Sequence, residues 1–326
     1  MLPLYVMKRI AVFVALSALL SSTLFLSCKG PEAPVDPKPD DKPVVEKPST
    51  WPEAGMENAS YITNGKIQIG VDLERGGSIF HFSTASEKRN LLNHNDEGRF
   101  VQQSYYGDED GSKWNGNPWR WNPVQGGSWQ GKKASITSKS ISDSKITVST
   151  CPMHWATGEL LTECSMTEVI TLEGDCAHIQ YSFTNSGKSH KARHQEMPAV
   201  FCDYDLGTLV YYKGSKPWTG DVVTRTVPKN LSDGATNQYV TRTEEWSAYV
   251  DDSDYGLGVY TPGTTQITYY TFGHGPGGAG NPSCSYFAPI RTLAITKGLE
   301  LKYDVYLTIG TLEQIRSRFK ELHDRL

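Results

Sequence analysis

From Tyr61 onward, the chain consists of short alternating or apolar runs separated by Gly, Asn, Asp and Ser, and this pattern constrains the fold more than any other feature. Short runs bounded by turn residues predict β-strands. In residues 61–71 an Asn-Gly pair separates two such runs, which is the strongest short signal for a hairpin. Residues 167–172 and 177–183 predict a second hairpin. Only residues 311–326 have apolar positions at helical spacing.

No internal repeat and no low-complexity break divides residues 53–326. All-β sandwiches often reach about 250 residues as one domain, so this length does not require two. The sequence therefore predicts a single all-β domain over residues 53–326. We expect a large antiparallel β-sandwich with a short C-terminal helix, and we expect it to be a monomer.

The first 28 residues have a different character. Lys8 and Arg9 precede an apolar run over residues 10–20, and small residues and then Cys28 follow. A basic start, an apolar middle and small residues before a cleavage site are typical of a secretory signal peptide. A Cys directly after this pattern resembles the lipobox of bacterial lipoproteins. The resemblance implies a signal peptide of residues 1–27, a lipid anchor on Cys28 and a place in the cell envelope of a Gram-negative bacterium, periplasmic or at the cell surface. A plain signal peptide is the alternative.

Residues 28–52 are rich in Pro, Asp, Glu and Lys and contain almost no apolar residues. Such a segment cannot bury enough surface to offset its chain entropy, and its prolines favour extended polyproline II. We therefore expect a disordered tether that joins the membrane anchor to the folded domain.

The charge and the cysteines of the chain exclude some partners. The formal net charge is -4 and no long basic run occurs, whereas nucleic acids and anionic lipid surfaces require clustered Lys and Arg. Nucleic acid is therefore not an expected partner. Besides Cys28 there are five cysteines, and none has the spacing of a zinc site. We expect buried free thiols, no metal and no cofactor.

Residues 96–129 contain the densest group of side chains suited to sugars. Four Trp fall within sixteen residues, among Asn, Gly and Pro and without the period of a strand, so we predict a long loop. Trp and Tyr rings stack on the apolar faces of sugars, while Arg, Gln and Asn bond to hydroxyls. The alternative is that the rings pack over the edge of the sandwich. The candidate substrate-binding residues are Arg99, Gln102, Gln103, Tyr106, Trp119, Trp121 and Trp129.

The guanidinium of Arg99 has two possible roles. Its planar fork suits a carboxylate or a sulfate, so it would fit an acidic sugar such as a uronate. Equally, Arg99 could pair with Asp96 or Glu97 and only hold the loop.

Further segments supply groups for acid–base chemistry. His194 and Glu196 lie in a polar run just before a strand-like segment, and a polar hairpin end is the alternative. Glu163 lies on one face of a strand predicted from residue 161, where it could form the carboxylate pair of a glycosidase with Glu196. A surface glutamate is the simpler explanation of Glu163. Tyr105 could be the base of a lyase, and His154 could contact substrate.

Several motifs resemble bacterial proteins with the galactose-mutarotase-like supersandwich. They are residues 93–99 (NHNDEGR), 102–106 (QQSYY), 195–199 (QEMPA), 286–289 (YFAP) and 303–307 (YDVYL). The resemblance covers most of residues 60–320. It implies a fold that sugar epimerases, accessory domains of hydrolases and lyases, and some catalytic sandwiches share. It therefore implies a carbohydrate partner but no particular reaction.

Together these features predict a carbohydrate-active lipoprotein that cleaves a glycosidic bond of a polysaccharide or oligosaccharide. A hydrolase would use Glu163 and Glu196. A lyase would use Tyr105 or His194 as its base, with Arg99 neutralising a uronate. A non-catalytic glycan-binding lipoprotein is the alternative, and a sugar epimerase is a third hypothesis.

Overall fold

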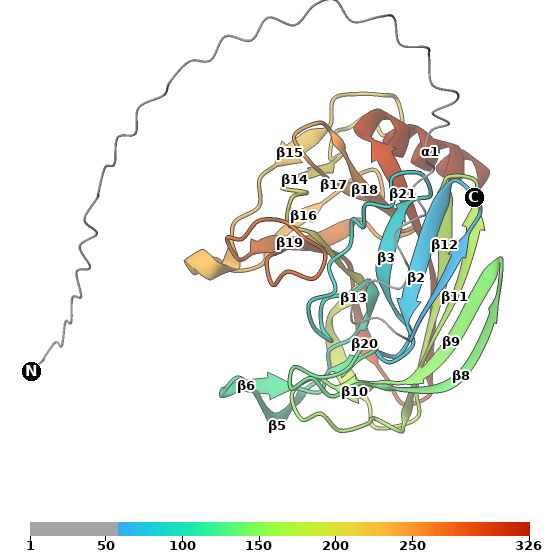
Figure 1. Cartoon of the computed structure of the whole chain (residues 1–326). Helices are drawn as coiled ribbons and strands as arrows, with labels where there is room; N and C mark the ends of the chain where they lie inside the picture. Colours follow the sequence, from blue (N-terminus) through green and yellow to red (C-terminus); the bar gives the residue numbers. More distant parts are fainter. Residues whose placement is uncertain (1–57) are drawn as a thin grey trace, which may run out of the picture. The chain divides into compact units, whose positions relative to one another are not determined.

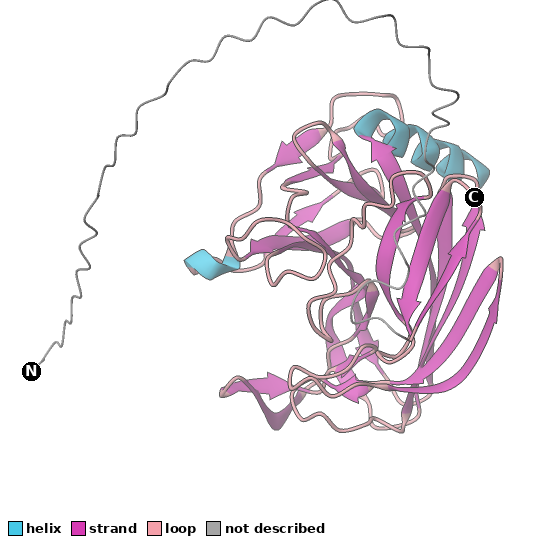
Figure 2. Ribbon diagram, in the orientation of Figure 1, coloured by secondary structure: helices cyan, strands magenta, loops and turns pink. Residues whose placement is uncertain are grey.

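Two large antiparallel sheets form the sandwich in the computed structural model, which describes residues 58–326 (Figures 1 and 2). The described residues belong to one compact unit. The signal peptide predicted for residues 1–27, the lipidation site Cys28 and the tether of residues 28–52 lie outside the described residues. Within residues 58–326, no helix has both the length and the apolar character needed to cross a membrane.

The larger sheet has nine strands, all antiparallel to their neighbours. In spatial order they are β15 (Thr224–Thr226), β14 (Thr208–Tyr211), β17 (Trp246–Val250), β18 (Tyr255–Tyr260), β21 (Leu299–Thr311), β12 (Cys176–Asn185), β11 (Cys164–Glu173), β9 (Lys145–Cys151) and β8 (Ser135–Ser142). The predicted second hairpin is confirmed, because β11 and β12 pair along their full length across a two-residue turn.

The second sheet has seven strands. In spatial order they are β10 (Met153–His154), β7 (Pro123–Val124), β4 (Gln102–Ser104), β13 (His190–Asp203), β20 (Cys284–Ile295), β19 (Gln266–Phe272) and β16 (Gln238–Thr241). A smaller sheet of β1 (Ala59–Thr63), β2 (Ile67–Asp72) and β3 (Ser78–Thr84) contributes to the same core. The hairpin predicted over residues 61–71 is confirmed as the β1–β2 pair.

The main core lies between the sheets because each strand alternates its side chains. On β20, Phe287 is buried in this core, whereas its neighbours Tyr286 and Ala288 belong to a small cluster on the outer face of the seven-stranded sheet. The described cysteines outside the N-terminal segment are free thiols, and four of these five are buried. The outer cluster with Tyr286 and Ala288 makes that face of the seven-stranded sheet partly apolar. The cleft described below lies on this outer face.

The predicted C-terminal helix is α1 (Leu312–Arg325). Thr311 caps it in a capping box with Gln314, in which each side chain accepts from the other residue's backbone N–H. The helix packs through Ile315 and Phe319 on the outer face of the nine-stranded sheet. A Cβ at Gly258 would lie 2.4 Å from Ile315, so this close approach requires a glycine.

The Trp-rich segment is not the long loop that the sequence predicts. It contains β4, β7 and an exposed hairpin of β5 (Glu109–Trp114) and β6 (Asn117–Arg120). Asn115 and Gly116 form its turn, both with positive φ, as a two-residue hairpin requires. The Asn-Gly signal was present in the sequence, but the absence of apolar alternation on either side concealed it.

An irregularity in β13 shapes the cleft. His194 and Glu196 lie inside this continuous strand rather than before it. Pairing with β4 and β20 shifts register after Glu196, so the strand contains a bulge. Pro198, which has no N–H for the ladder, lies in this bulge. As a result Glu196 and Ala199, three positions apart, both face the same cleft.

Candidate functional site

Two connected spaces hollow the outer face of the seven-stranded sheet. The first, called here the narrow pocket, has a volume of about 250 Å³ and is lined by Trp114, Trp119, Trp155, Tyr270 and Tyr286, among others. The second, called the wide groove, has a volume of about 730 Å³ and is lined by Arg120, Arg193, His194, Tyr239 and Thr292, among others. Tyr106, Trp119, Glu196 and Asn237 line both spaces.

Glu196 is the carboxyl group at the junction of the two spaces. Its side chain is 9% exposed. Its Oε1 accepts hydrogen bonds from the hydroxyl of Tyr106 at 3.0 Å and from the hydroxyl of Tyr286. Burial raises the pKa of Glu196, and the hydrogen bonds from Tyr286, Ser104 and Tyr106 offset this only in part. The site therefore stabilises the protonated form of this carboxyl relative to a carboxyl in water.

Both phenols beside Glu196 stay protonated. Burial raises the pKa of Tyr106 and of Tyr286 well above the ordinary value, and the neighbouring Glu196 charge adds to both shifts. Gln195 fixes the backbone of Tyr106, because its side chain accepts from the Tyr106 N–H at 2.7 Å and donates to the Tyr106 carbonyl at 3.0 Å. The carboxyl and its donors are thus held in place before any ligand arrives.

Aromatic rings form the wall of the narrow pocket. Trp114 and Trp119 lie 4.6 Å apart between ring centroids, and Trp155 lies 5.9 Å from Trp114. Tyr270 stacks on Tyr286 at 4.3 Å. Trp114 is 37% exposed, and Trp119 is partly exposed. Exposed rings around a buried polar group are the usual make-up of a small-molecule site.

His154 anchors the hairpin that carries this wall. It is buried, and its Nδ1 accepts from the Ala156 N–H at 3.1 Å, so its proton is on Nε2, 2.8 Å from Asp110 Oδ2 on β5. Partial burial of Asp110 opposes ionisation, but hydrogen bonds from Ser112 and His154 outweigh it and lower its pKa. The predicted substrate-binding residue His154 lines neither space, so its role is to position the hairpin.

Comparisons with known proteins bear on the fold. No family model matches the sequence, and no curated protein matches it. An aldose 1-epimerase candidate from Escherichia coli K12 has a TM-score of 0.50 at 12% identity, covering 78% of this chain and 99% of that chain. A mutarotase candidate from Salmonella typhimurium, YeaD, has a TM-score of 0.50 at 9% identity, covering 78% and 90%. The predicted fold is confirmed. This chain has the galactose-mutarotase-like β-sandwich. A galactose mutarotase-like protein from Clostridium acetobutylicum also matches, with a TM-score of 0.48 at 9% identity, covering 78% and 95%.

Several predicted binding residues of this galactose-mutarotase-like sandwich have other partners. The side chain of Gln102 touches the narrow pocket, but it accepts from the Gly126 N–H at 2.7 Å and donates to the Glu97 carbonyl at 3.2 Å. Gln103 is buried and donates to the Thr167 carbonyl. Neither amide is available to a ligand.

Two of the predicted tryptophans also lie outside both spaces. Trp121 is buried and stacks on His190 at 4.2 Å. Trp129 is exposed and donates to the Ala156 carbonyl. Of the predicted aromatic residues, Trp119 and Tyr106 are the two that line the cleft.

Tyr105 cannot be the base that the sequence suggested. Its side chain is fully buried in the main core. Its hydroxyl donates to the amide oxygen of Gln103 at 2.9 Å and lies 3.3 Å from the hydroxyl of Tyr303, and its ring lies 4.4 Å from that of Phe183. Burial raises its pKa, so the phenol stays protonated. Adjacent residues of a strand point to opposite faces, and Tyr106, not Tyr105, reaches the cleft.

Glu163 and Arg99 are not brought to the cleft either. Glu163 packs against Gly187 and lines neither space. Among the described residues that line the two spaces, Glu196 is the only carboxylate, so the predicted pair is not assembled. Arg99 forms an ion pair with Asp96 at 3.2 Å and lies over the ring of Phe272. Of the two roles considered for Arg99, binding an anion or pairing with a neighbouring carboxylate, the structure shows the second.

The sequence did not identify some of the lining residues. Tyr270 and Tyr286 come from β19 and β20, far along the chain from Glu196, and Asn237 precedes β16. The available signal was alternation: Tyr286, Ala288 and Ile290 occupy every second position of one strand. The alternation along β20 does not tell which face of the strand packs in the core and which lines the cleft.

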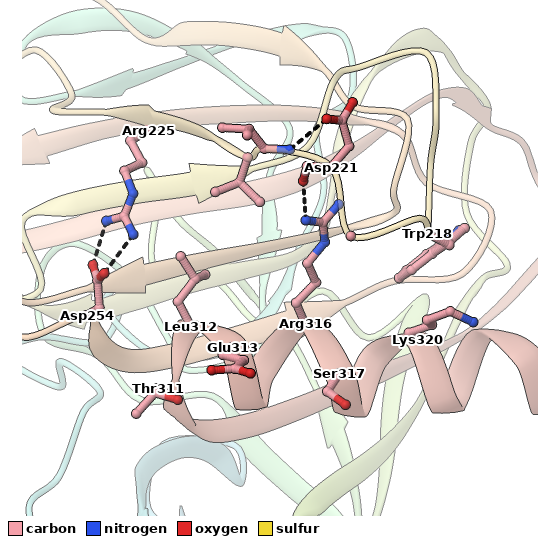
Figure 3. Close-up of a pocket in the computed structure, with 13 residues that line it drawn as sticks. Trp218, Asp221, Arg225, Asp254, Thr311, Leu312, Glu313, Arg316, Ser317 and Lys320 are labelled. Atoms are coloured by element: carbon pink, nitrogen blue, oxygen red, sulfur yellow. Dashed lines mark hydrogen bonds and ion pairs between the residues drawn. The ribbon is translucent and has the colours of Figure 1, made fainter.

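A larger hollow of about 860 Å³ lies beside α1 (Figure 3). The arginines that line it have partners. Arg225 binds the Asp254 carboxylate through both terminal nitrogens, and Arg316 donates to the Asp221 carbonyl (Figure 3). Arg316 also pairs with the buried Glu244. Lys320 pairs with Asp324. No cluster of metal-ligating side chains occurs in residues 58–326.

Proposed function

We propose that this chain is a carbohydrate-active enzyme that hydrolyses a glycosidic bond of an oligosaccharide or polysaccharide, with Glu196 as the general acid. The observation that carries the proposal is the position of Glu196, a buried carboxyl with a raised pKa at the junction of the two spaces. A glycosidic oxygen beside Glu196 would have one sugar ring in the narrow pocket and the next in the wide groove. A carboxyl kept protonated is the acid that such a bond requires.

His194 is the complementary base. It is exposed in the wide groove, and its Nδ1 lies 2.7 Å from the hydroxyl of Thr292. It lies two positions from Glu196 on the same strand, so the two Cα atoms are about 7 Å apart and both side chains share a face. As the bond between the anomeric carbon and the glycosidic oxygen breaks, Glu196 gives its proton to that oxygen. Water adds to the anomeric carbon and gives its proton to His194.

The tyrosines near the cleft are not suited to the elimination reaction of a lyase, so a lyase would have to use His194 as its base. Elimination needs a base that removes a proton from carbon, and Tyr106 and Tyr286 have raised pKa values, so neither becomes a phenolate at neutral pH. Tyr105 has no access to a ligand. Arg99, expected to neutralise a uronate, is paired with Asp96.

A sugar epimerase is the second candidate. Opening a hemiacetal ring needs one base and one acid but no pair of carboxylates, and Glu196 is the only carboxylate among the described residues that line the cleft. Two structures of the same fold carry the names aldose 1-epimerase and mutarotase. Faster interconversion of the anomers of a free sugar, followed by NMR, would support this candidate.

The test of the proposal is a screen of the purified protein against neutral and uronate-containing polysaccharides. We expect new reducing ends without absorbance from unsaturated uronates. Reducing ends together with that absorbance would mean a lyase. Neither signal, combined with retention on a glycan column, would mean a non-catalytic binding protein and would overturn the proposal.

Trp119 and Trp121 form a matched pair for testing the binding wall. Trp119→Ala removes a stacking surface, so we expect a loss of about 1–3 kcal/mol in glycan affinity, by analogy with base stacking, and little change in stability. Trp121→Ala empties a buried site, so we expect about 3–5 kcal/mol lower free energy of unfolding. Calorimetric titration and urea unfolding measure the two quantities. Unchanged affinity in folded Trp119→Ala would remove that ring from the binding site.

We also propose that the protein is a lipoprotein of the cell envelope, anchored through Cys28. The support is the sequence pattern before this residue. Cys28→Ser should transfer the protein from the membrane fraction to the soluble fraction after a high-salt wash, as judged by immunoblotting. Retention of this variant on membranes would contradict a lipid anchor.

A further inference from the structure

The charges that line the wide groove are not balanced. Arg120 and Arg193 bring two guanidinium groups, and Glu196 is the single carboxylate among the described lining residues. The Glu196 carboxyl accepts from the hydroxyls of Tyr106 and Tyr286, and among the described residues it forms an ion pair with neither guanidinium. The groove therefore has an excess of positive charge in a protein whose net charge is negative.

Arg120 has no carboxylate partner. It ends strand β6, is partly buried, and lies over the ring of Trp119 at 5.7 Å. Within residues 58–326 no acidic side chain lies within ion-pair distance of its guanidinium, and none of its side-chain nitrogens donates a hydrogen bond. Burial raises the pKa of Tyr106, and the charge of Arg120 opposes this shift, which places Arg120 close to the Glu196 cluster. A guanidinium held on an aromatic ring, without a partner, is ready to bind an anion.

Arg193 has only a distant partner. Its guanidinium lies 3.8 Å from the Asp108 carboxylate, and that carboxylate also accepts from the Lys191 N–H. The Nε of Arg193 is buried and has no hydrogen-bond acceptor. Leaving such a donor unsatisfied is unfavourable, so an acceptor supplied by a ligand would stabilise it.

We propose that the wide groove binds the anionic group of an acidic saccharide, a carboxylate or a sulfate, through Arg120 and Arg193. The inference rests on the proposed function, because it places the charged sugar in the space next to the Glu196 carboxyl. Planar guanidinium groups match the two-oxygen edge of either anion. The exposed ring of Tyr239, which lines the same groove, offers a surface for the sugar that carries the anion. This assigns to Arg120 and Arg193 the role that the sequence alone suggested for Arg99.

The test measures binding separately from turnover. The probes are a galacturonate oligosaccharide, a sulfated carrageenan oligosaccharide and a neutral cello-oligosaccharide of matched length, titrated into the full protein by calorimetry. We expect at least one anionic probe to bind tighter than the neutral one, with an affinity that falls as salt is added. The galacturonate and carrageenan arms distinguish a carboxylate from a sulfate. Tighter binding of the neutral probe would overturn the inference.

Two variants assign the effect to the groove. Arg120→Gln should weaken binding of the preferred anionic probe by about 10-fold or more, as expected for loss of a charge-assisted hydrogen bond, and Arg120→Lys should restore part of it. Arg225→Gln makes the same change in net charge at the separate hollow and should have no effect. Equal affinities for Arg120→Gln and Arg225→Gln would overturn the inference. If the anionic probes bind as expected but no glycan is cleaved, the proposed function fails and this inference stands. If glycans are cleaved but only neutral ones bind or react, the proposed function stands and this inference fails.

Discussion

Replacing Glu196 with Gln is expected to lower kcat by about 10²–10⁴-fold, the usual contribution of a general acid, while glycan binding persists. Gln keeps the shape of the side chain and an oxygen that can accept from Tyr106 and Tyr286, but it has no proton to give to a glycosidic oxygen. The measurement is kcat on the glycan found by the screen, with affinity from calorimetry and the melting temperature as the check on folding.

Glu163→Gln is the matched control, because Glu163 lies outside both spaces. We expect it to retain full activity. If instead the control loses activity and Glu196→Gln keeps it, Glu196 is not the acid. The pH dependence gives a second check: the acid works only while protonated, so activity should fall as pH rises through the raised pKa of Glu196.

Glu168→Gln is expected to stabilise the protein by several kcal/mol at alkaline pH. Glu168 is fully buried, and within residues 58–326 its carboxylate forms no ion pair. Burial raises its pKa from 4.5 to about 8, and the neighbouring Gln125 offsets this only in part. Between pH 4.5 and about pH 8, Glu168 is therefore protonated in the folded state and ionised in the unfolded state. The stability of the wild type should therefore fall as pH rises, by about 1.4 kcal/mol per unit and about 4–5 kcal/mol over the window.

Urea unfolding between pH 5 and pH 9 measures this effect. The wild type and Glu168→Gln should differ least near pH 5, and the variant should be clearly more stable near pH 8. Glu173→Gln, at an exposed position on the same strand, is the control and should follow the wild type. Parallel curves for the wild type and Glu168→Gln would show that Glu168 has an ordinary pKa in the folded protein.

The spacing of apolar residues along the sequence was enough to predict the fold class, the two hairpins and the C-terminal helix. Strand alternation and helical spacing can both be read from neighbouring residues alone. It was not enough to choose between faces. Tyr105 and Tyr106 are adjacent and chemically equal, yet one lies in the core and the other in the cleft. Likewise Glu163, expected on a strand that starts at residue 161, lies in the turn just before β11 and is half-buried, whereas Glu168 within that strand is buried.

The remaining part of the site depends on contacts that no local pattern encodes. Glu196 was identified because polar residues surround it in the sequence, but its partner Tyr286 comes from a strand 90 residues away. The bulge at Pro198, which brings Glu196 and Ala199 to one face, is a property of how β13 pairs with both neighbours. The register of one strand against its two neighbours is known only once the sheet is folded.

The cleft is built from two structural parts, the seven-stranded sheet and the β5–β6 hairpin, and the sequence of one part can change without disturbing the other. Glu196 stands on a strand paired on both sides, where a change of backbone would disturb two neighbours. The tryptophan wall stands on a two-stranded excursion whose Gly111 and Gly116 have open space around them. Insertions beside these glycines meet no packed neighbour, whereas replacing either glycine would strain its left-handed backbone. One side of the cleft can therefore change with the hairpin, while the Glu196 carboxyl keeps its position on the sheet.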